Sequence, residues 1–244
     1  MSRIIFITGT GTGVGKTTLT CLLLRHLRDS GVKALAMKPF CSGGKDDLQA
    51  FQNIQGEGLS QRLLNPYYFP EPLAPALAKR DGKPQISLSS TLRVIRAASQ
   101  KCDCLLVEGA GGVLVPITKH LMMADVIAAL DCDVIVVSKN ELGTLNHTLL
   151  TLEALRSRRI WRMKVVFFET KNPDASSKSN PVWIAECPIN IGVFKLPYRK
   201  SKSRLEEANL RESKNFQKTL AQICGPDSFC PVVRTAEKSS ETKD

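Results

Sequence analysis

Residues 4–18 read IIFITGTGTGVGKTT, and this stretch decides the fold. Its first four residues are apolar, and such a run suits a strand that is covered on both faces of a parallel sheet. The glycines that follow let the backbone turn sharply and point its N–H groups inward, where the oxygens of a polyphosphate can accept them. A helix is expected to begin near Gly15, and its N-terminus adds unsatisfied N–H groups and a positive dipole. The stretch therefore predicts a strand, a phosphate loop and a helix.

The side chains of this loop fit the same prediction. Lys16 is placed to reach the β- and γ-phosphates, and the Thr17 hydroxyl to ligate Mg²⁺. The common pattern has its first glycine where Thr10 stands, whereas here the glycine is Gly9, so the loop is one residue longer. A glycine-rich turn beside a surface lysine is the structural alternative. We favour the phosphate loop because the strand, the glycines, the Lys-Thr-Thr sequence and an apolar helix follow one another in the required order.

Length and composition indicate one α/β domain. The chain has 244 residues, of which 43% are hydrophobic, and this is ample for a single core. We expect residues 1–224 to form that domain. Residues 225–244 are polar and without periodicity, so we expect a disordered tail. No stretch approaches the roughly 20 apolar residues of a membrane span, and residues 1–20 lack the features of a signal peptide. These observations predict a cytoplasmic protein.

The net charge of +11 is concentrated in one part of the chain. Between residues 156 and 218, 15 Lys or Arg residues accompany six Asp or Glu residues. This pattern favours a solvated basic face that attracts an anionic nucleotide over a surface for nucleic acid or membrane. The eight cysteines include several in or beside apolar runs, so we expect all of them to be reduced and structural.

Further buried strands follow the first one. The second is predicted between Gly31 and Pro39, and the helix that precedes it makes a βαβ unit. A helix is predicted over residues 87–100, begun by serines that can cap it. The remaining strands are predicted at residues 102–107, 133–138, 163–168 and 191–196. This order predicts a doubly wound, mostly parallel sheet of the P-loop NTPase type, with its ligand at the carboxyl ends of the strands.

Two segments between these elements are predicted as loops. Residues 40–58 are polar and contain glycine, which indicates a functional loop followed by a short helix. Residues 65–72 contain prolines that exclude a regular helix. Their aromatic side chains are candidates for the wall of a pocket, and a surface connection is the alternative.

A carboxylate follows the strand at residues 102–107. Glu108 comes at the carboxyl end of this strand, which should place it beside the phosphate loop. Mg²⁺ takes oxygen ligands, so two carboxylates together with Thr17 and phosphate oxygens would suit it. Asp46 and Asp47 are the candidates for the second carboxylate, and an exposed position in a loop is the alternative for either of them.

Other polar residues also follow strands. Lys38 comes directly after the second strand, where it can stabilise charge that develops on a transferred phosphoryl group, and Ser42 is near enough to bind the same substrate. Asn146 and His147 are expected just before a helix, where they either cap it or bind a carboxylate at its N-terminus.

These motifs together resemble the dethiobiotin synthetase family. The sequences GTGTGVGKT at 9–17, MKP at 37–39 with Ser42, VEGAGG at 107–112, and Leu142-Gly143 with Asn146 and His147 occur in the family's order between residue 3 and about residue 155. The resemblance implies a homodimeric cytoplasmic enzyme that makes dethiobiotin from 7,8-diaminopelargonate, CO₂ or bicarbonate, and ATP with Mg²⁺.

The resemblance also implies roles for individual residues. Lys16 and Lys38 would act in catalysis by contacting phosphates and developing charge. Thr17, Asp47 and Glu108 would hold the metal, and Thr12, Ser42 and Asn146 the substrate, with Asn146 reaching its carboxylate across the dimer interface. Residues at the nucleotide would be Gly13, Val14, Gly15, Lys16, Thr17, Thr18, Glu108 and Pro197.

Two positions depart from the family's pattern. Gly11 stands where the family usually has Asp, so one acidic contact of the loop is missing. Phe168 stands where many members have an Asn that contacts the base, which leaves stacking on the base, or the use of another nucleoside triphosphate, as alternatives. The competing class is the MinD/ParA-like switch ATPases. These carry a signature lysine early in the loop, at the position that Gly11 occupies here.

Overall fold

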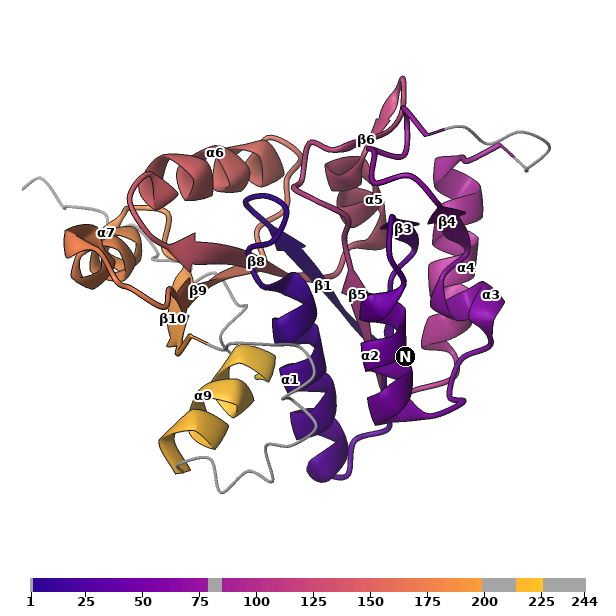
Figure 1. Ribbon diagram of the computed structural model, residues 1–244, viewed down its shortest axis with the longest axis horizontal. Helices are drawn as coiled ribbons and strands as arrows, with labels where there is room; N and C mark the ends of the chain where they lie inside the picture. The colour runs from indigo at the N-terminus through magenta and orange to yellow at the C-terminus, as the bar shows by residue number, and fades with distance from the viewer. Residues whose placement is uncertain (1, 79–84, 199–213, 226–244) are drawn as a thin grey trace, which may run out of the picture.

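The computed structural model describes residues 2–78, 85–198 and 214–225. The central feature is a six-stranded sheet with the order β10-β9-β8-β1-β5-β2, in which every neighbouring pair is parallel. Figure 1 shows the first helix, α1, running back down from the loop that follows β1. The strands are β1 (Arg3–Gly9), β2 (Ala34–Met37), β5 (Cys104–Glu108), β8 (Asp133–Asn140), β9 (Met163–Glu169) and β10 (Gly192–Leu196). The predicted doubly wound, parallel P-loop fold is confirmed, with a strand at each predicted place.

Helices cover both faces of the sheet (Figure 1). On one face α1 packs against α2 and α9. On the other face α5 packs against α4 and α6, and α6 also contacts α7. Their bounds are α1 Lys16–Asp29, α2 Asp46–Gln55, α3 Gln61–Leu64, α4 Leu88–Ser99, α5 Met123–Leu130, α6 Thr144–Arg156, α7 Asn180–Glu186 and α9 Lys214–Cys224, with a 3₁₀ turn η1 at Ala175–Lys178. The serine cap predicted for the helix at residues 87–100 is present, since Ser87 Oγ accepts a hydrogen bond from Ser90 N at 3.1 Å.

Two small strand pairs lie outside the main sheet. The parallel pair β3 (Phe40–Ser42) and β4 (Tyr67–Phe69) ties the loop after β2 to the proline-containing segment. The antiparallel pair β6 (Pro116–Thr118) and β7 (Leu121–Met122) follows the glycines after β5. These pairs were not predicted, because strands of two or three residues show no usable periodicity.

The predicted role of the aromatic residues in the segment 65–72 is wrong. Tyr67 is buried and stacks on Phe40 with ring centroids 5.1 Å apart, and Phe69 is fully buried. Tyr68 donates a hydrogen bond from its hydroxyl to Gly43 O at 2.8 Å. The rings therefore fix the β3–β4 pair to the core, and Pro72 is the residue of this segment that lines the pocket described below.

The end of α9 is held at the amino ends of the strands, opposite the phosphate loop at their carboxyl ends. Lys164 on β9 is fully buried, and its ammonium donates to the carbonyls of Gln222 and Ile223 at 2.7 Å each and of Gly225 at 3.0 Å. Arg3 at the start of β1 donates to the Cys224 carbonyl. The last carbonyls of a helix lack partners within the helix, so these two cations act as its cap. The predicted disordered tail falls almost entirely on residues 226–244, which lie outside the described residues.

A glutamine side chain covers part of the edge strand β2. Gln55 at the end of α2 accepts a hydrogen bond from Ala36 N at 2.7 Å and donates one to Ala36 O at 3.1 Å. Its carboxamide thus takes the place of a neighbouring strand at this residue.

Candidate active site

The phosphate loop connects β1 to α1 in the expected way. Gly13 and Gly15 have φ angles of +73° and +105°, a region that side chains other than glycine rarely adopt, and Gly15 is the N-cap residue of α1. The Thr10 amide donates to Val137 O at 3.0 Å, which fixes the start of the loop on β8. Lys16 folds back over the loop, and its ammonium donates to the Gly11 carbonyl at 2.6 Å. The loop is therefore formed, and its lysine points into the space that a polyphosphate would fill.

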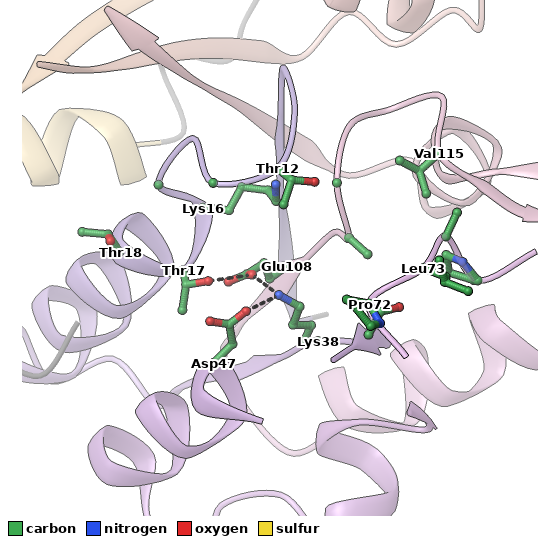
Figure 2. Close-up of a pocket in the computed structure, with 17 residues that line it drawn as sticks. Thr12, Lys16, Thr17, Thr18, Lys38, Asp47, Pro72, Leu73, Glu108 and Val115 are labelled. Atoms are coloured by element: carbon green, nitrogen blue, oxygen red, sulfur yellow. Dashed lines mark hydrogen bonds and ion pairs between the residues drawn. The ribbon is translucent and has the colours of Figure 1, made fainter. Parts of the chain in front are cut away.

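Glu108 is the centre of a buried polar cluster. Its side chain is 1% exposed. Oε1 accepts hydrogen bonds from Thr17 Oγ1 at 2.9 Å and from the ammonium of Lys38 at 2.6 Å, and Oε2 accepts one from Thr20 Oγ1 at 3.2 Å. The same ammonium lies 2.5 Å from Asp47 Oδ2. Figure 2 shows Lys38 between the two carboxylates, with Thr17 beside Glu108.

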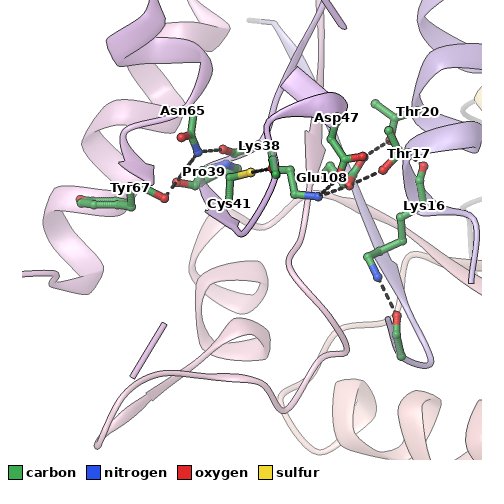
Figure 3. Close-up of polar contacts among 12 residues, drawn as sticks. Lys16, Thr17, Thr20, Lys38, Pro39, Cys41, Asp47, Asn65, Tyr67 and Glu108 are labelled. Carbon is green, nitrogen blue, oxygen red and sulfur yellow. Dashed lines mark hydrogen bonds and ion pairs between the residues drawn. The ribbon is translucent and has the colours of Figure 1, made fainter. Parts of the chain in front are cut away.

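The backbone of Lys38 is held from the other side. Its amide donates to Leu64 O at 2.9 Å, and its carbonyl accepts from Asn65 Nδ2 at 2.7 Å (Figure 3). These bonds tie the end of β2 to the segment after α3. Only the flexible part of the Lys38 side chain thus extends toward the carboxylates.

The two lysines experience different electrostatic surroundings. Burial opposes the charged form of Lys38, but the charges of Glu108 and Asp47 and their hydrogen bonds outweigh burial and hold the pKa of Lys38 above its ordinary value. Burial lowers the pKa of Lys16 to about 8, with the carboxylate of Glu108 opposing the shift and the ammonium of Lys38 adding to it. Both ammonium groups therefore carry charge at neutral pH, as the stabilisation of phosphate oxygens requires.

A pocket of about 530 Å³ opens over this cluster. One wall is the phosphate loop with the start of α1, and the base of the pocket is the Lys38, Asp47 and Glu108 cluster. The opposite wall is apolar and comes from two loops: Pro72, Leu73, Ala74 and Pro75 from one, and Ala110 and Val115 from the other (Figure 2). The Ser42 hydroxyl is buried at this pocket and has no hydrogen-bond partner among the described residues, so a ligand atom is a suitable partner for it.

Most of the residues predicted for the site meet in this pocket. Those that line it are Thr12, Gly13, Gly15, Lys16, Thr17, Thr18, Lys38, Ser42, Asp47 and Glu108. Val14 is buried beneath the loop, and Asn146 and Pro197 are exposed elsewhere; none of the three lines the pocket. Of the two aspartates at the start of α2, Asp47 faces Lys38 and Asp46 is exposed. The structure thus places Asp47 and not Asp46 at the cluster.

The expected position of Asn146 and His147 before a helix is wrong. Both residues lie in the first turn of α6, whose N-cap residue is Gly143 with a φ of +90°. Neither side chain makes a capping hydrogen bond to this helix in the described structure. Gly143 was not recognised as the cap because a left-handed glycine ends a loop without a polar side chain to mark it.

The sequence did not single out every residue of the site. Thr20 was missed, although it stands three residues after Thr17 and therefore on the same face of α1. The Pro72–Pro75 wall was missed because a loop carries no periodic signal that gives its direction. The paired prolines were the one available sign of a rigid segment.

Phe168 lies against the phosphate loop. It is the penultimate residue of β9, it is buried, and a β carbon built on Gly15 would lie 2.7 Å from its Cδ2 atom. Phe168 therefore presents an apolar ring at the start of α1, where an asparagine would present an amide.

The side chains at the base of the pocket fit a magnesium ion. Thr17, Asp47 and Glu108 offer only oxygen atoms, which hard divalent cations prefer, and a positively charged group already bridges the two carboxylates. No group of three or more His, Cys, Asp and Glu side chains forms a metal cage among residues 2–78, 85–198 and 214–225. A site with few protein ligands is typical of Mg²⁺ that is held together with the phosphates of a substrate.

The sequence was compared with known proteins. Residues 3–208 match the AAA domain family (AAA_26). A protein of Anaeromyxobacter sp. (strain Fw109-5) named ATP-dependent dethiobiotin synthetase BioD is 41% identical over 188 residues, which cover 75% of this chain and 84% of the relative. The chain belongs to the dethiobiotin synthetase family. A protein of the same name from Methanocaldococcus jannaschii is 41% identical to this chain over 160 residues, which cover 75% of that relative. Another, from Bacillus velezensis, is 32% identical to this chain over 197 residues, which cover 84% of it.

Solved structures show the same fold at low sequence identity. A ParA family ATPase from Chlorobium tepidum TLS superposes with a TM-score of 0.58 at 15% identity, covering 91% of this chain and 98% of that one. A plasmid partition protein of Borrelia burgdorferi B31 bound to AMPPNP gives 0.56 at 14% identity, covering 91% and 96%. These matches support the P-loop fold alone. No helix among the described residues is long and apolar enough to cross a membrane.

Proposed function

We propose that this protein is a Mg²⁺-dependent dethiobiotin synthetase, a ligase of biotin biosynthesis. In this reaction 7,8-diaminopelargonate, CO₂ and a nucleoside triphosphate give dethiobiotin, the nucleoside diphosphate and phosphate. The observation that carries the proposal is the position of Lys38: its ammonium joins Asp47 and Glu108 beside the phosphate loop and faces a pocket with an apolar wall. Family membership supplies the substrates. We expect the enzyme in the cytoplasm, where reduced cysteines such as Cys132 and Cys224 persist.

The chemistry needs positioning and charge neutralisation more than a strong base. The nitrogen of one substrate amine adds to the carbon of CO₂ and loses a proton, which gives a carbamate. Its oxygen attacks the γ-phosphorus, the bond to the β–γ bridging oxygen breaks, and the nucleoside diphosphate leaves. The second amine then attacks the carbonyl carbon of the carbamic-phosphoric anhydride, phosphate leaves, and the nitrogen gives up a proton as the ureido ring closes. Each step develops negative charge on oxygen, which fixed cations stabilise.

We assign the residues of the pocket to these steps. Lys16 and the loop amides bind the β- and γ-phosphates, and Lys38 neutralises charge on the carbamate and the transferred phosphoryl group. Thr17, Asp47 and Glu108 are the residues that would hold Mg²⁺, which when bound offsets the charge of the phosphates. The Ser42 hydroxyl, which has no hydrogen-bond partner in the described part of the chain, binds the carbamate end of the substrate, and Thr12 contacts the substrate from the loop.

The apolar wall of the pocket can bind the hydrocarbon part of the substrate. Diaminopelargonate carries a hydrocarbon chain that ends in a carboxylate. Leu73, Pro75 and Val115 can cover this chain at the side of the pocket that faces the charged cluster.

A homodimer would complete the site. Asn146 is exposed on α6, outside the pocket of its own chain, so its proposed contact with the substrate carboxylate requires a second copy. Leu142 and Leu150, four residues to either side of Asn146, are 83% and 61% exposed. Leu150 lies on α6 and Leu142 in the loop just before its N-cap residue, and exposed large apolar side chains suit burial against a partner.

The direct test is product formation. Purified protein incubated with diaminopelargonate, bicarbonate, Mg²⁺ and ATP should give dethiobiotin and phosphate, with ATP, GTP and CTP assayed in parallel. The Lys38→Met variant should lose at least roughly a hundredfold in kcat/KM, because one preorganised charge is removed. Lys101→Met serves as the matched control, since Lys101 is exposed at the end of α4, away from the pocket. Absence of dethiobiotin with every nucleotide would refute the proposal, and nucleotide hydrolysis that needs no diaminopelargonate would favour a switch ATPase.

A further inference from the structure

Lys38 occupies the point where the proposed metal ligands converge. Its ammonium is 2.5 Å from Asp47 Oδ2 and 2.6 Å from Glu108 Oε1, and the same Glu108 atom accepts the Thr17 hydroxyl. The proposed function assigns three side chains to Mg²⁺. Two of them, Asp47 and Glu108, bind this ammonium, and the third, Thr17, is hydrogen-bonded to Glu108. The salt bridges of Lys38 and a bound metal ion would compete here for the same carboxylate oxygen atoms of Asp47 and Glu108.

The burial of the carboxylates explains why a cation is needed at this point. The Glu108 side chain is 1% exposed and that of Asp47 is 18% exposed, so two uncompensated negative charges here would be costly. Lys38 supplies the positive charge in the free protein. Once a divalent cation lies on these carboxylates, an ammonium at the same place is no longer required and is repelled.

The attachment of Lys38 allows it to move. Its backbone is fixed through Leu64 and Asn65, while its side chain lines the pocket together with Ser42. A rotation of the side chain alone can therefore carry the ammonium from the carboxylates toward the substrate side, without a change in the sheet.

We propose that Lys38 is an exchangeable internal counter-ion, which holds Asp47 and Glu108 in the free enzyme and is released into the pocket when the metal arrives with the nucleotide. This inference rests on the proposed function, because it takes these residues as the metal ligands. It gives the lysine two consecutive positions. The charge that acts on the substrate becomes available only after the nucleotide and its metal are in place.

Competition with an internal cation predicts weak binding of free metal. In the wild-type protein a divalent ion without nucleotide has to displace the ammonium. In Lys38→Met the same carboxylates remain without the ammonium of Lys38 between them, so they should bind the ion more tightly. The difference should be at least about tenfold, because a unit charge within a few ångströms acts strongly at a buried site.

Binding of Mn²⁺ without nucleotide, followed by electron paramagnetic resonance, tests this inference. We expect at least tenfold tighter binding to Lys38→Met than to wild type, and wild-type binding to Lys101→Met. Loss of the tighter binding in the double variant Lys38→Met/Asp47→Asn would locate the ion. Equal or weaker binding to a folded Lys38→Met, checked by circular dichroism, would overturn the inference.

A measurement on the wild-type protein covers the case in which Lys38→Met does not fold. The ammonium signal of Lys38 in ¹⁵N-lysine NMR, assigned by its loss in Lys38→Arg, should move when Mg²⁺ and a non-hydrolysable ATP analogue are added together. It should stay in place when either is added alone. An unchanged signal with both present would also overturn the inference. Neither experiment uses diaminopelargonate, so a failure here is distinct from a failure to form dethiobiotin.

Discussion

The ring of Phe168 lies so close to the α carbon of Gly15 that a β carbon there would be 2.7 Å from Cδ2 of the ring. This contact joins the end of β9 to the N-cap residue of the helix that follows the phosphate loop. If the phosphates of the nucleotide occupy the loop, its base lies near the end of β9 and the start of α1. An aromatic ring offers stacking, which every base accepts, but no hydrogen bond that distinguishes one base from another.

We therefore predict broad use of nucleotides. The kcat/KM values for ATP, GTP and CTP in dethiobiotin formation should differ by less than about tenfold, because the ring of Phe168 offers no polar contact that distinguishes one base from another. Phe168→Asn should change the ratio among them, whereas Phe194→Leu, on the neighbouring strand β10, should not. A preference for ATP of more than about a hundredfold in the wild-type protein would contradict this prediction.

Lys16→Ala should remove phosphoryl transfer and leave the fold intact. Its ammonium donates to the Gly11 carbonyl in the loop itself, so removal of the lysine side chain leaves the core unchanged. Dethiobiotin formation should fall by at least roughly a hundredfold. The midpoint of urea unfolding should stay close to that of the wild-type protein. An active Lys16→Ala enzyme would exclude the loop from the mechanism.

Asp46 and Asp47 form a matched pair of neighbours. Asp47→Asn should lower kcat/KM by roughly a hundredfold or more and raise the Mg²⁺ concentration required for half-maximal rate, because it alters both the Lys38 contact and the proposed metal ligand. Asp46→Asn, which changes an exposed residue, should stay within about twofold of wild type. Equal losses in the two variants would remove the special role of Asp47.

The proposed homodimer can be tested at α6. Leu150→Glu places a charge on the exposed apolar face, so sedimentation should show a shift from dimer to monomer together with a loss of ligation. The control is Trp161→Glu, which should sediment as wild type. Trp161 is 53% exposed and lies beyond the C-terminal end of α6. A wild-type protein that is a fully active monomer would refute the role of Asn146 across an interface.

The buried Lys164 predicts a dependence of stability on pH. Burial lowers the pKa of Lys164 to about 7, with Arg3 adding to the shift and Asp133 opposing it. An unfolded lysine titrates near about 10.4, so between these values the unfolded chain binds the proton and the folded chain does not. The free energy of unfolding should therefore rise with pH from about 7 to about 10, at no more than about 1.4 kcal/mol per pH unit for this group.

Urea unfolding of wild type and Lys164→Met at pH 7 and pH 9 measures this contribution. The wild-type midpoint should rise more between the two pH values than the midpoint of the variant. The variant should also lose part of the cap at the end of α9, which limited proteolysis near residue 224 would detect. Parallel pH profiles for the two proteins would contradict the assignment of the shift to Lys164.

The main sheet was predictable because its strands are continuous apolar runs covered on both faces. The cluster of Thr17, Lys38 and Glu108 was predictable for a related reason, since the carboxyl ends of parallel strands meet at one edge. The strand at 102–107 in fact begins at Cys104, because the Cys102 amide closes the turn after α4 by donating to Ser99 O at 3.2 Å. Features that depend on contacts between loops could not be predicted from local sequence.

Two helices, α5 and α9, were also missed. α5 (Met123–Leu130) is almost wholly apolar, so it shows no alternation between a buried and an exposed face. α9 follows a long polar stretch and depends on tertiary partners, among them Lys164 and Arg3, for its end. Tertiary contact, and not local propensity, decides whether such segments form helices.

The hydrogen bonds of Gln55 to both backbone groups of Ala36 have a consequence for how copies of this chain can associate. Edge strands with unpaired backbone groups invite pairing with the edge of another molecule, and this is a common route to aggregation. The carboxamide of Gln55 blocks that route at the middle of β2, only two residues before Lys38. The proposed self-association is thereby directed away from extension of the sheet and toward helix surfaces. Gln55→Leu would leave the site unchanged and open this edge to β-aggregation.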